Sequence, residues 1–307
     1  MDMPLSIRPP KPEDAKEVCD LVIACDIEDF GSPDFDLGEL LDMWEGFDLQ
    51  NNVWIIEDNA AQIVGYAFLE EDSEEKIFSY GFVLPSSRGI GVGSKLISAI
   101  ENRAQELSLS SGMVKRLQNL IPTGRDDAQK LLQSRGFQPV RYFKRMSITM
   151  EEAPVTPQVP NGIVIEPFKK GQDEREVYYT YIESFTDHWD FTAPSYEKWV
   201  EKTQRDTFTP EWWFVARSET GEVAGIALCR MNEDCLFVNQ LGVKSAYRGT
   251  GLGMALLQHS FFCAYAAGQR TVSLGVDSAN PTGARRLYER AGMKAIHDVT
   301  LCEKIIR

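Results

Sequence analysis

The sequence predicts an α/β protein that contains two copies of one domain, each with a mixed β-sheet flanked by helices. The segment R-G-I-G-V-G at residues 88–93 recurs as R-G-T-G-L-G at residues 248–253, an offset of 160 positions (248 − 88). Each segment follows a β-like apolar stretch and precedes a helical pattern. A repeat of this length indicates a duplicated domain, because solenoid repeats are only about 20–50 residues long.

The expected domain boundaries follow from the chain length and from a proline-rich segment. A chain of 307 residues exceeds the usual size of one hydrophobic core. Pro154, Pro157 and Pro160 stand at every third position, which is typical of an extended polyproline spacer. We therefore expect an N-terminal domain over residues 1–150, a linker over 151–162 and a C-terminal domain over 163–307.

Hydrophobic periodicity and turn residues predict the same order of elements in both copies, β-α-α-β-β-β-α-β-α-β. In the first copy, strands are expected at residues 5–8, 53–57, 63–69, 76–83 and 114–120, helices at 12–24, 37–44, 94–107 and 127–134, and a last strand after the final helix. In the second copy, strands are expected at 163–166, 212–217, 223–230, 236–243, 271–276 and 298–306, and helices at 174–185, 195–203, 254–267 and 281–291.

Composition restricts the class of function. The net charge of −14 argues against nucleic-acid binding, which depends on neutralising phosphates. The N-terminus lacks the pattern of a secretory signal, and no apolar run is long enough to cross a membrane. Six cysteines without a C-x-x-C pair favour a reducing cytoplasm, and three scattered histidines give no support for a metal site.

The negative charge is concentrated near the N-terminus. Residues 13–48 are strongly acidic and contain a single base, Lys16. One interpretation is an acidic entrance that attracts a cationic amine, and the other is a pair of solvated helix faces. The sequence leaves both open.

The two glycine-rich segments are candidate phosphate-binding loops. A turn between a strand end and a helix start presents consecutive backbone N–H groups, and the helix N-terminus adds partial positive charge. Glycine lets the backbone approach a ligand without a Cβ in the way. Neither segment carries the Gly-Lys-Ser/Thr of a P-loop, and each follows a late strand rather than the first strand of a dinucleotide-binding fold.

The pattern V-x4-R-G-x-G-x-G, followed by a strand and by N-x3-A-R-R-L-Y-E-R-A-G-M at residues 280–293, resembles the GCN5-related N-acetyltransferase (GNAT) superfamily. The resemblance covers nearly the whole chain, with one unit in each half. It implies two tandem acyl-CoA N-acyltransferase domains, each with a mixed, mostly antiparallel sheet flanked by helices. It also implies acetyl-CoA as the acyl donor and no metal.

The resemblance assigns roles to particular residues. In that family the loop holds the cofactor pyrophosphate through backbone amides, the preceding strand pairs with pantetheine, and a later asparagine contacts the cofactor arm. Cofactor binding is thus expected at Leu241, Val243, Arg248, Gly249, Thr250, Gly251, Leu252, Gly253, Met254 and Asn280. A second candidate cofactor loop, in the first copy, comprises Val83, Arg88, Gly89, Gly91, Gly93 and Ser94.

The same resemblance makes Tyr288 the catalytic candidate, because a tyrosine at this spacing typically protonates the departing CoA thiolate in the family. Amine attack on a thioester needs such an acid and no covalent nucleophile. The alternative role for Tyr288 is packing on an amphipathic helix. Aligned on Gly136 and Gly292, the first copy has Leu132 at this position, which has no proton to give. We therefore expect the second copy to be catalytic and the first to be a cofactor-binding or structural relic.

The general base and the acceptor site are less well defined. Some family members place a glutamate eleven residues before the loop arginine, where this chain has Phe237 (248 − 237 = 11). Asn239 and Gln240 are candidates to orient a water, or polar groups that close the split between strands. His188 and Trp189 are candidates to contact the acceptor, and His188 to supply a base. The alternatives are a surface or capping histidine and an aromatic core.

The leading hypothesis is an N-acetyltransferase that transfers acetyl from acetyl-CoA to a small-molecule amine by direct attack in a ternary complex. Two alternatives stay open: a non-catalytic acyl-CoA sensor or scaffold, and an acetyltransferase for a protein or peptide amine. The expected partner is the small amine, without nucleic acid or membrane, and the expected state is a monomer or homodimer.

Overall fold

The computed structural model describes residues 5–33, 35–205, 208–232, 235–280 and 282–307. These residues form two compact units. The first unit combines Met1–Phe143 with His297–Arg307, and the second is Lys144–Ile296.

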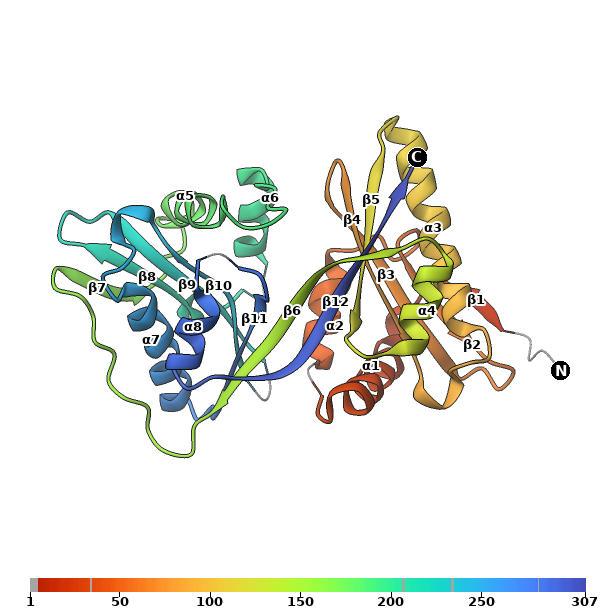
Figure 1. Cartoon of the computed structure of the whole chain (residues 1–307), viewed down its shortest axis with the longest axis horizontal. Coiled ribbons are helices and arrows are strands. Elements are labelled where there is room, and N and C mark those ends of the chain that lie inside the picture. Colours follow the sequence, from red (N-terminus) through yellow and green to blue (C-terminus); the bar gives the residue numbers. More distant parts are fainter. Residues whose placement is uncertain (1–4, 34, 206–207, 233–234, 281) are drawn as a thin grey trace. The chain divides into compact units, whose positions relative to one another are not determined.

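The first unit is a sheet with helices on both faces. Its strands follow the order β1-β2-β3-β4-β5-β12, and β4 and β5 are parallel whereas the other described pairs are antiparallel. Helices α1 and α2 cover one face and α3 and α4 the other (Figure 1). The bounds are β1 Ser6–Arg8, α1 Ala15–Phe30, α2 Leu37–Glu45, β2 Val53–Glu57, β3 Ile63–Ser73, β4 Lys76–Val83, α3 Val92–Ser111, β5 Lys115–Pro122, α4 Asp126–Ser134 and β12 Lys294–Ile306.

The second unit repeats this arrangement. Strands β7 to β10 are antiparallel neighbours, β11 runs parallel to β10, and β6 is next in the sheet order. Helices α5 and α6 pack on one face and α7 and α8 on the other (Figure 1). The bounds are β6 Gln138–Thr149, β7 Ile163–Pro167, α5 Glu174–Phe185, α6 Tyr196–Glu201, β8 Trp213–Ser218, β9 Val223–Met231, β10 Leu236–Val243, α7 Leu252–Ala266, β11 Thr271–Asp277 and α8 Ala284–Arg290. The expected fold class, two domains with mixed and mostly antiparallel sheets, is confirmed.

The two units differ from the expected domains at their C-terminal ends, because the later residues of each copy's last strand, 144–149 of β6 and 297–306 of β12, belong to the other unit. Strand β12 pairs with β5 from Val299↔Pro122 to Ile306↔Lys115 and contributes to the core of the first unit. In the second unit the Met150 N–H donates to the Arg270 carbonyl at 2.7 Å. A local sequence pattern identifies a strand but not its non-local partner, which explains why the exchange was not expected.

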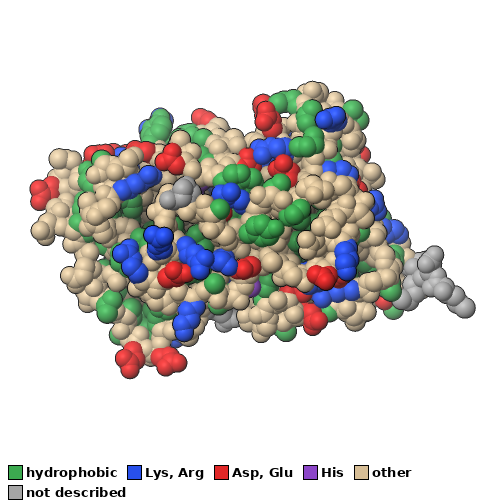
Figure 2. Space-filling view, in the orientation of Figure 1, with side chains coloured by type: hydrophobic (Ala, Val, Ile, Leu, Met, Phe, Trp, Pro, Cys, Tyr) green, Lys and Arg blue, Asp and Glu red, His purple; other side chains and the backbone are tan. Residues whose placement is uncertain are grey.

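Many acids of the segment 13–48 have structural partners. Asp14 pairs with Arg8 at 2.7 Å, Glu17 accepts from the Ile63 N–H at 2.8 Å, and Asp36 caps α2 by accepting from the Glu39 N–H at 2.8 Å. Acidic and basic side chains are interspersed on the face shown in Figure 2. These contacts favour a structural role for much of the acidic segment. Among the described residues, no helix is both long and apolar enough to span a membrane.

Candidate active site

The glycine loop of the second unit forms an open cradle at the start of α7. Gly249 (φ +78°) and Gly251 (φ +93°) adopt the left-handed conformation that side chains disfavour, and Gly251 caps α7. A Cβ at either position would meet no described atom within 4 Å. The first backbone N–H groups of α7 have no partner inside the helix and therefore face this open space. The cradle fits a pyrophosphate or another anion.

Other residues of the loop hold the cradle in place. Arg248 donates from Nε to the Val243 carbonyl at 3.2 Å and from Nη2 to the Ser184 carbonyl at 3.4 Å. These bonds tie the loop to the end of β10 and to α5, and the guanidinium stays partly exposed. A Cβ on Gly253 would lie 3.2 Å from Leu287 Cδ1, so this glycine permits close packing of α7 on α8. Thr250 donates to the Tyr247 carbonyl at 2.7 Å.

The strand before the loop separates from its neighbour. Strand β10 pairs with β11 only from Leu236↔Val272 to Val238↔Leu274, although β10 continues to Val243. A bulge at Asn239 shifts the register of β10 against β9 at this point. A bulge leaves one residue outside the ladder and redirects the strand. The predicted pantetheine-pairing residues Leu241 and Val243 lie beyond the bulge, on the separated part of the strand.

Tyr288 lies on α8, with a largely buried side chain and an unengaged hydroxyl. Its side chain is 8% exposed and belongs to the apolar cluster that includes Leu252 and contacts Leu241 and Val243. No described residue forms a hydrogen bond with the hydroxyl. Burial raises the pKa of Tyr288 to about 12. The hydroxyl therefore keeps its proton throughout the neutral range and can act as a donor.

Asn280 organises the turn that precedes α8. Its side-chain oxygen accepts from Thr282 N at 2.8 Å and from Thr282 Oγ1 at 2.6 Å. The expected helix 281–291 begins later, at Ala284, because Gly283 has φ +76° and such a residue cannot continue an α-helix. The expected first residue of that helix, Pro281, lies outside the described residues. Asn280 therefore precedes the helix by a turn rather than opening it.

His188 lies near the mouth of the loop. Its ring is 4.5 Å from that of Phe185, centroid to centroid. Burial lowers the pKa of His188, the charge of Arg248 lowers it further, and the charge of Asp277 raises it. The preceding residue, Asp187, lies 3.6 Å from Arg248, and the lowered pKa makes His188 neutral near pH 7. Trp189, its neighbour, is 37% exposed.

The two polar residues of β10 have different environments. Asn239, the bulge residue, is exposed, whereas Gln240 is partly buried. The Gln240 Oε1 atom is buried and has no hydrogen-bond partner among the described residues. A buried acceptor of this kind favours a ligand donor at the same place.

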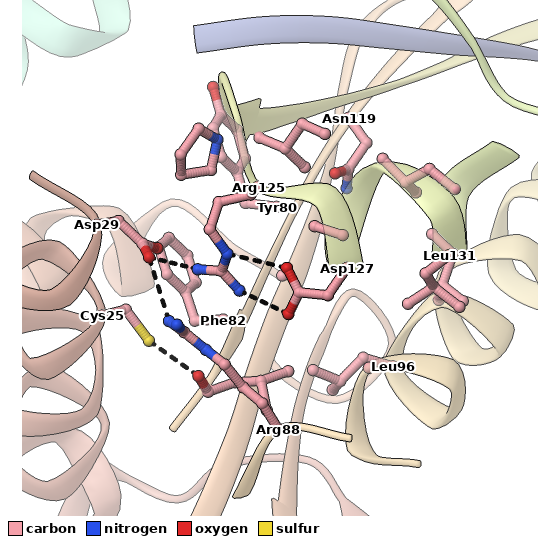
Figure 3. A pocket seen from close by; sticks show the side chains of 18 of the residues that line it. Cys25, Asp29, Tyr80, Phe82, Arg88, Leu96, Asn119, Arg125, Asp127 and Leu131 are labelled. Atoms are coloured by element: carbon pink, nitrogen blue, oxygen red, sulfur yellow. Dashed lines mark hydrogen bonds and ion pairs between the residues drawn. The ribbon is translucent and has the colours of Figure 1, made fainter. Parts of the chain in front are cut away.

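The first-copy loop borders a cavity of about 520 Å³ within the first unit (Figure 3). All six residues of the second candidate loop line it, together with apolar side chains of α3 and α4. Gly89 (φ +81°) and Gly91 (φ +95°) repeat the left-handed geometry of the second loop. The cavity also has Leu132 on its wall, at the position that corresponds to Tyr288.

An ion-pair cluster at this cavity was missed by the sequence reasoning. Asp29 binds Arg88 at 3.3 Å and also pairs with Arg125, which in turn binds Asp127 at 3.0 Å (Figure 3). Hydrogen bonding from Arg125 holds the pKa of Asp127 below its usual range. Cys25 donates to the Val83 carbonyl at 3.2 Å. The available signal was the charged segment Arg125-Asp126-Asp127 at the start of α4, where the second copy has Asn280 before α8.

The two copies also differ in the strand before the loop. Strand β4 pairs with β3 in unbroken register from Glu70↔Phe78 to Gly65↔Val83. It therefore has no bulge at the position where β10 has one. The first copy keeps a loop and a cavity but lacks both the bulge and the tyrosine. Among the described residues, no group of His, Cys, Asp and Glu side chains is arranged to hold a metal ion.

Comparison with known proteins identifies both halves. A model of the acetyltransferase (GNAT) family matches residues 175–293, and a model of an acetyltransferase (GNAT) domain matches residues 50–139. The mycothiol acetyltransferase of Propionibacterium freudenreichii subsp. shermanii is 27% identical over 292 residues, which cover 92% of this chain and 86% of that protein.

Solved structures of GNAT proteins are also similar to this chain over nearly its whole length. A GCN5-related N-acetyltransferase from Sphaerobacter thermophilus is 32% identical, with a TM-score of 0.86 and coverage of 99% of this chain and 97% of that one. A tandem GNAT protein from the clavulanic acid biosynthesis pathway shares the fold at 16% identity, with a TM-score of 0.73 and coverage of 98% of each chain.

Proposed function

Because the chain belongs to the GCN5-related N-acetyltransferase (GNAT) family of acyltransferases, we propose that it transfers acetyl from acetyl-CoA to a small-molecule amine in the second unit. The observation that carries this proposal is the unengaged hydroxyl of the largely buried Tyr288 side chain, in the same unit as a glycine cradle that fits an anion. The first unit has the cradle without the hydroxyl. Relatives named mycothiol acetyltransferase over most of the chain support a small acceptor.

The residues around the second loop fit acetyl-CoA, which supplies an acyl thioester when bound. The backbone amides at Gly249–Met254 would hold the pyrophosphate, and the free edge of β10 at Leu241 and Val243 would hold the pantetheine arm. The side-chain NH2 of Asn280 remains available as a donor, because its oxygen is used in the turn. These assignments follow from the open cradle and from the separation of β10 from β11.

Two side chains supply the proton transfers. Tyr288 holds a proton at Oη and gives it to the departing thiolate. His188, neutral near pH 7, accepts the proton that the amine loses, directly or through a water. Gln240 directs its unpartnered Oε1 toward an N–H donor and so orients the acceptor. No covalent intermediate with the protein is needed.

In the first unit we propose cofactor binding without transfer. The cavity of about 520 Å³ at the loop favours this role, and Leu132 in place of the acid excludes proton donation. Because Asp29 and Asp127 together offset the charges of Arg88 and Arg125, this site is expected to bind acetyl-CoA more weakly than the second. It would then serve a structural or sensing purpose.

The function is tested by the release of CoA thiol from acetyl-CoA in the presence of amines. The panel contains the amine that mycothiol acetyltransferases use, amino acids, polyamines, amino sugars and a lysine peptide. We expect saturable thiol release with at least one small amine and none above background with the peptide. If no amine releases thiol while acetyl-CoA still raises the melting temperature, the result would support an acyl-CoA sensor rather than an acetyltransferase. A preference for the peptide would favour a protein acceptor.

The lowered pKa of His188 predicts how kcat depends on pH below neutrality. Because its pKa is lowered, His188 stays neutral at pH 7 and becomes charged only as the pH falls below about 6.5. The value of kcat, which reports groups in the ternary complex, should fall in that range. His188→Gln should lower kcat by about a hundredfold and abolish this dependence.

His259 provides the matched control for this test. It is a second partly buried histidine of the same unit with a lowered pKa, and it packs on Phe214 rather than near the loop. His259→Gln should keep the wild-type pH profile. An unchanged acidic limb in His188→Gln would show that another group is the base.

A further inference from the structure

A partly buried lysine side chain places its ammonium group among aromatic rings on the α5–α6 face of the second unit. Lys202 follows α6 in the short 3-10 helix Lys202–Gln204. Its Nζ lies 4.7 Å from the ring centroid of Trp199, 5.2 Å from that of Trp213 and 5.9 Å from that of Tyr181. Cation–π contacts compensate only part of the cost of removing an ammonium from water, and most buried charges are also paired.

Lys202 has no opposite charge beside it in the described part of the chain. No described carboxylate lies within ion-pair distance of its Nζ, and the charged neighbour that affects it is Arg205, of the same sign. Burial lowers the pKa of the Lys202 ammonium to about 8, and the charge of Arg205 contributes in the same direction. A negatively charged ligand would stabilise the charged form of Lys202 and offset this effect of burial.

A second donor without a partner belongs to the same aromatic group. The Nε1 atom of Trp199 is buried and has no hydrogen-bond partner among the described residues, and the whole side chain is only 3% exposed. An indole N–H can only donate. Lys202 and Trp199 thus contribute two donors to one aromatic group, and neither donor has a hydrogen-bond acceptor among the described residues. A carboxylate supplies the missing charge and the acceptor oxygens at once.

The register of the sheet connects this group to the site of transfer. Trp213 of β8 is the cross-strand partner of Leu228 of β9, which is paired with Gln240 of β10. Directly opposed residues place their side chains on the same face. Trp213, Leu228 and Gln240 therefore form a row across three neighbouring strands, and the row spans two strand spacings, about 10 Å. Gln240, with its unpartnered Oε1, follows the bulge where β10 leaves β11.

We propose that Lys202 and Trp199 bind a carboxylate of the acceptor, so that the acceptor is an amine that also carries a carboxylate at its far end. Gln240 then faces the amine end of the same molecule. This inference rests on the proposed function, since it assumes an amine acceptor in the second unit. It gives the substrate class that the glycine loop and Tyr288 do not specify.

The first test measures binding without turnover. The full-length protein is labelled with trinitrobenzenesulfonate, and modification of Lys202 is quantified by peptide mass spectrometry with the exposed Lys294 as the internal reference. We expect 6-aminohexanoate to slow labelling of Lys202 by about fivefold or more, and 6-aminohexanamide, which has an uncharged amide in place of the carboxylate, to have little effect. Equal protection by both compounds, or protection by neither, contradicts the carboxylate site.

The second test compares the same two amines as acceptors. The wild type should prefer the acid by about tenfold or more in kcat/KM, and Lys202→Met should bring that ratio close to one. Lys202→Arg should retain most of the preference because it keeps the charge. Melting temperatures of both variants check folding. A preference for the acid that persists in Lys202→Met overturns the assignment.

The two tests separate this inference from the proposed function. Protection of Lys202 by 6-aminohexanoate without thiol release from any amine would leave the carboxylate site in place and refute the acetyltransferase. Thiol release from both amines at equal rates without protection would support the acetyltransferase and refute the carboxylate site.

Discussion

Replacing Tyr288 by phenylalanine should lower kcat for acetyl transfer by about 10²–10³-fold while the affinity for acetyl-CoA stays within about twofold of the wild type. The substitution removes the hydroxyl and keeps the buried ring that packs in the apolar cluster of the second unit. It therefore removes the proton donor without opening a large cavity. Steady-state thiol release gives kcat, and calorimetric titration of acetyl-CoA gives the affinity.

Tyr179→Phe is the matched control, because Tyr179 lies on α5 and is 56% exposed. It should leave kcat unchanged.

The alkaline side of the wild-type pH profile of kcat adds a further check. Since the pKa of Tyr288 is raised to about 12, loss of its proton should not reduce kcat below about pH 10. A Tyr288→Phe variant with wild-type kcat would contradict the assignment of the acid.

A carboxylate placed in the second glycine loop should abolish productive cofactor binding. In Gly251→Asp the new charge lies where the pyrophosphate is expected, and the repulsion between charges about 5 Å apart is roughly 3 kcal/mol at an effective dielectric constant of 20. The KM for acetyl-CoA should rise by about a hundredfold. Aspartate tolerates the left-handed conformation better than most residues, so the fold should persist.

The first copy offers a control with the same geometry. Gly91 has φ +95° against +93° for Gly251, and a Cβ at either would meet no described atom within 4 Å. Calorimetry on the wild type should show two sites of unequal affinity. Gly91→Asp should remove the weaker site and leave the KM for acetyl-CoA near the wild-type value. Melting temperatures should show similar stability for the two variants.

The repeated parts of the fold could be predicted from the sequence because their determinants are local. Strands β2, β4 and β10 and helix α5 have the expected bounds, since apolar periodicity and turn residues define each of them. The left-handed glycines and the loop-to-helix transition follow from residue type alone. Two family domains with mixed sheets were likewise expected and are confirmed.

The parts that were not predicted depend on contacts between distant residues. The exchange of β12 requires pairing of Val299 with Pro122, which no local pattern specifies. The pairing of Asp29 with Arg125 likewise joins side chains 96 positions apart. The bulge at Asn239 is visible only in the register of β10 against β9. The aromatic enclosure of Lys202 similarly needs α6 to pack on β8.

The most direct test of transfer in the second unit is to measure thiol release by Gly91→Asp and Gly251→Asp side by side. Both variants receive the same amine and the same acetyl-CoA concentration, set below the wild-type KM. The account predicts a rate near that of the wild type for Gly91→Asp and a rate about a hundredfold lower for Gly251→Asp. The reverse order, or equal losses in both variants, would contradict it.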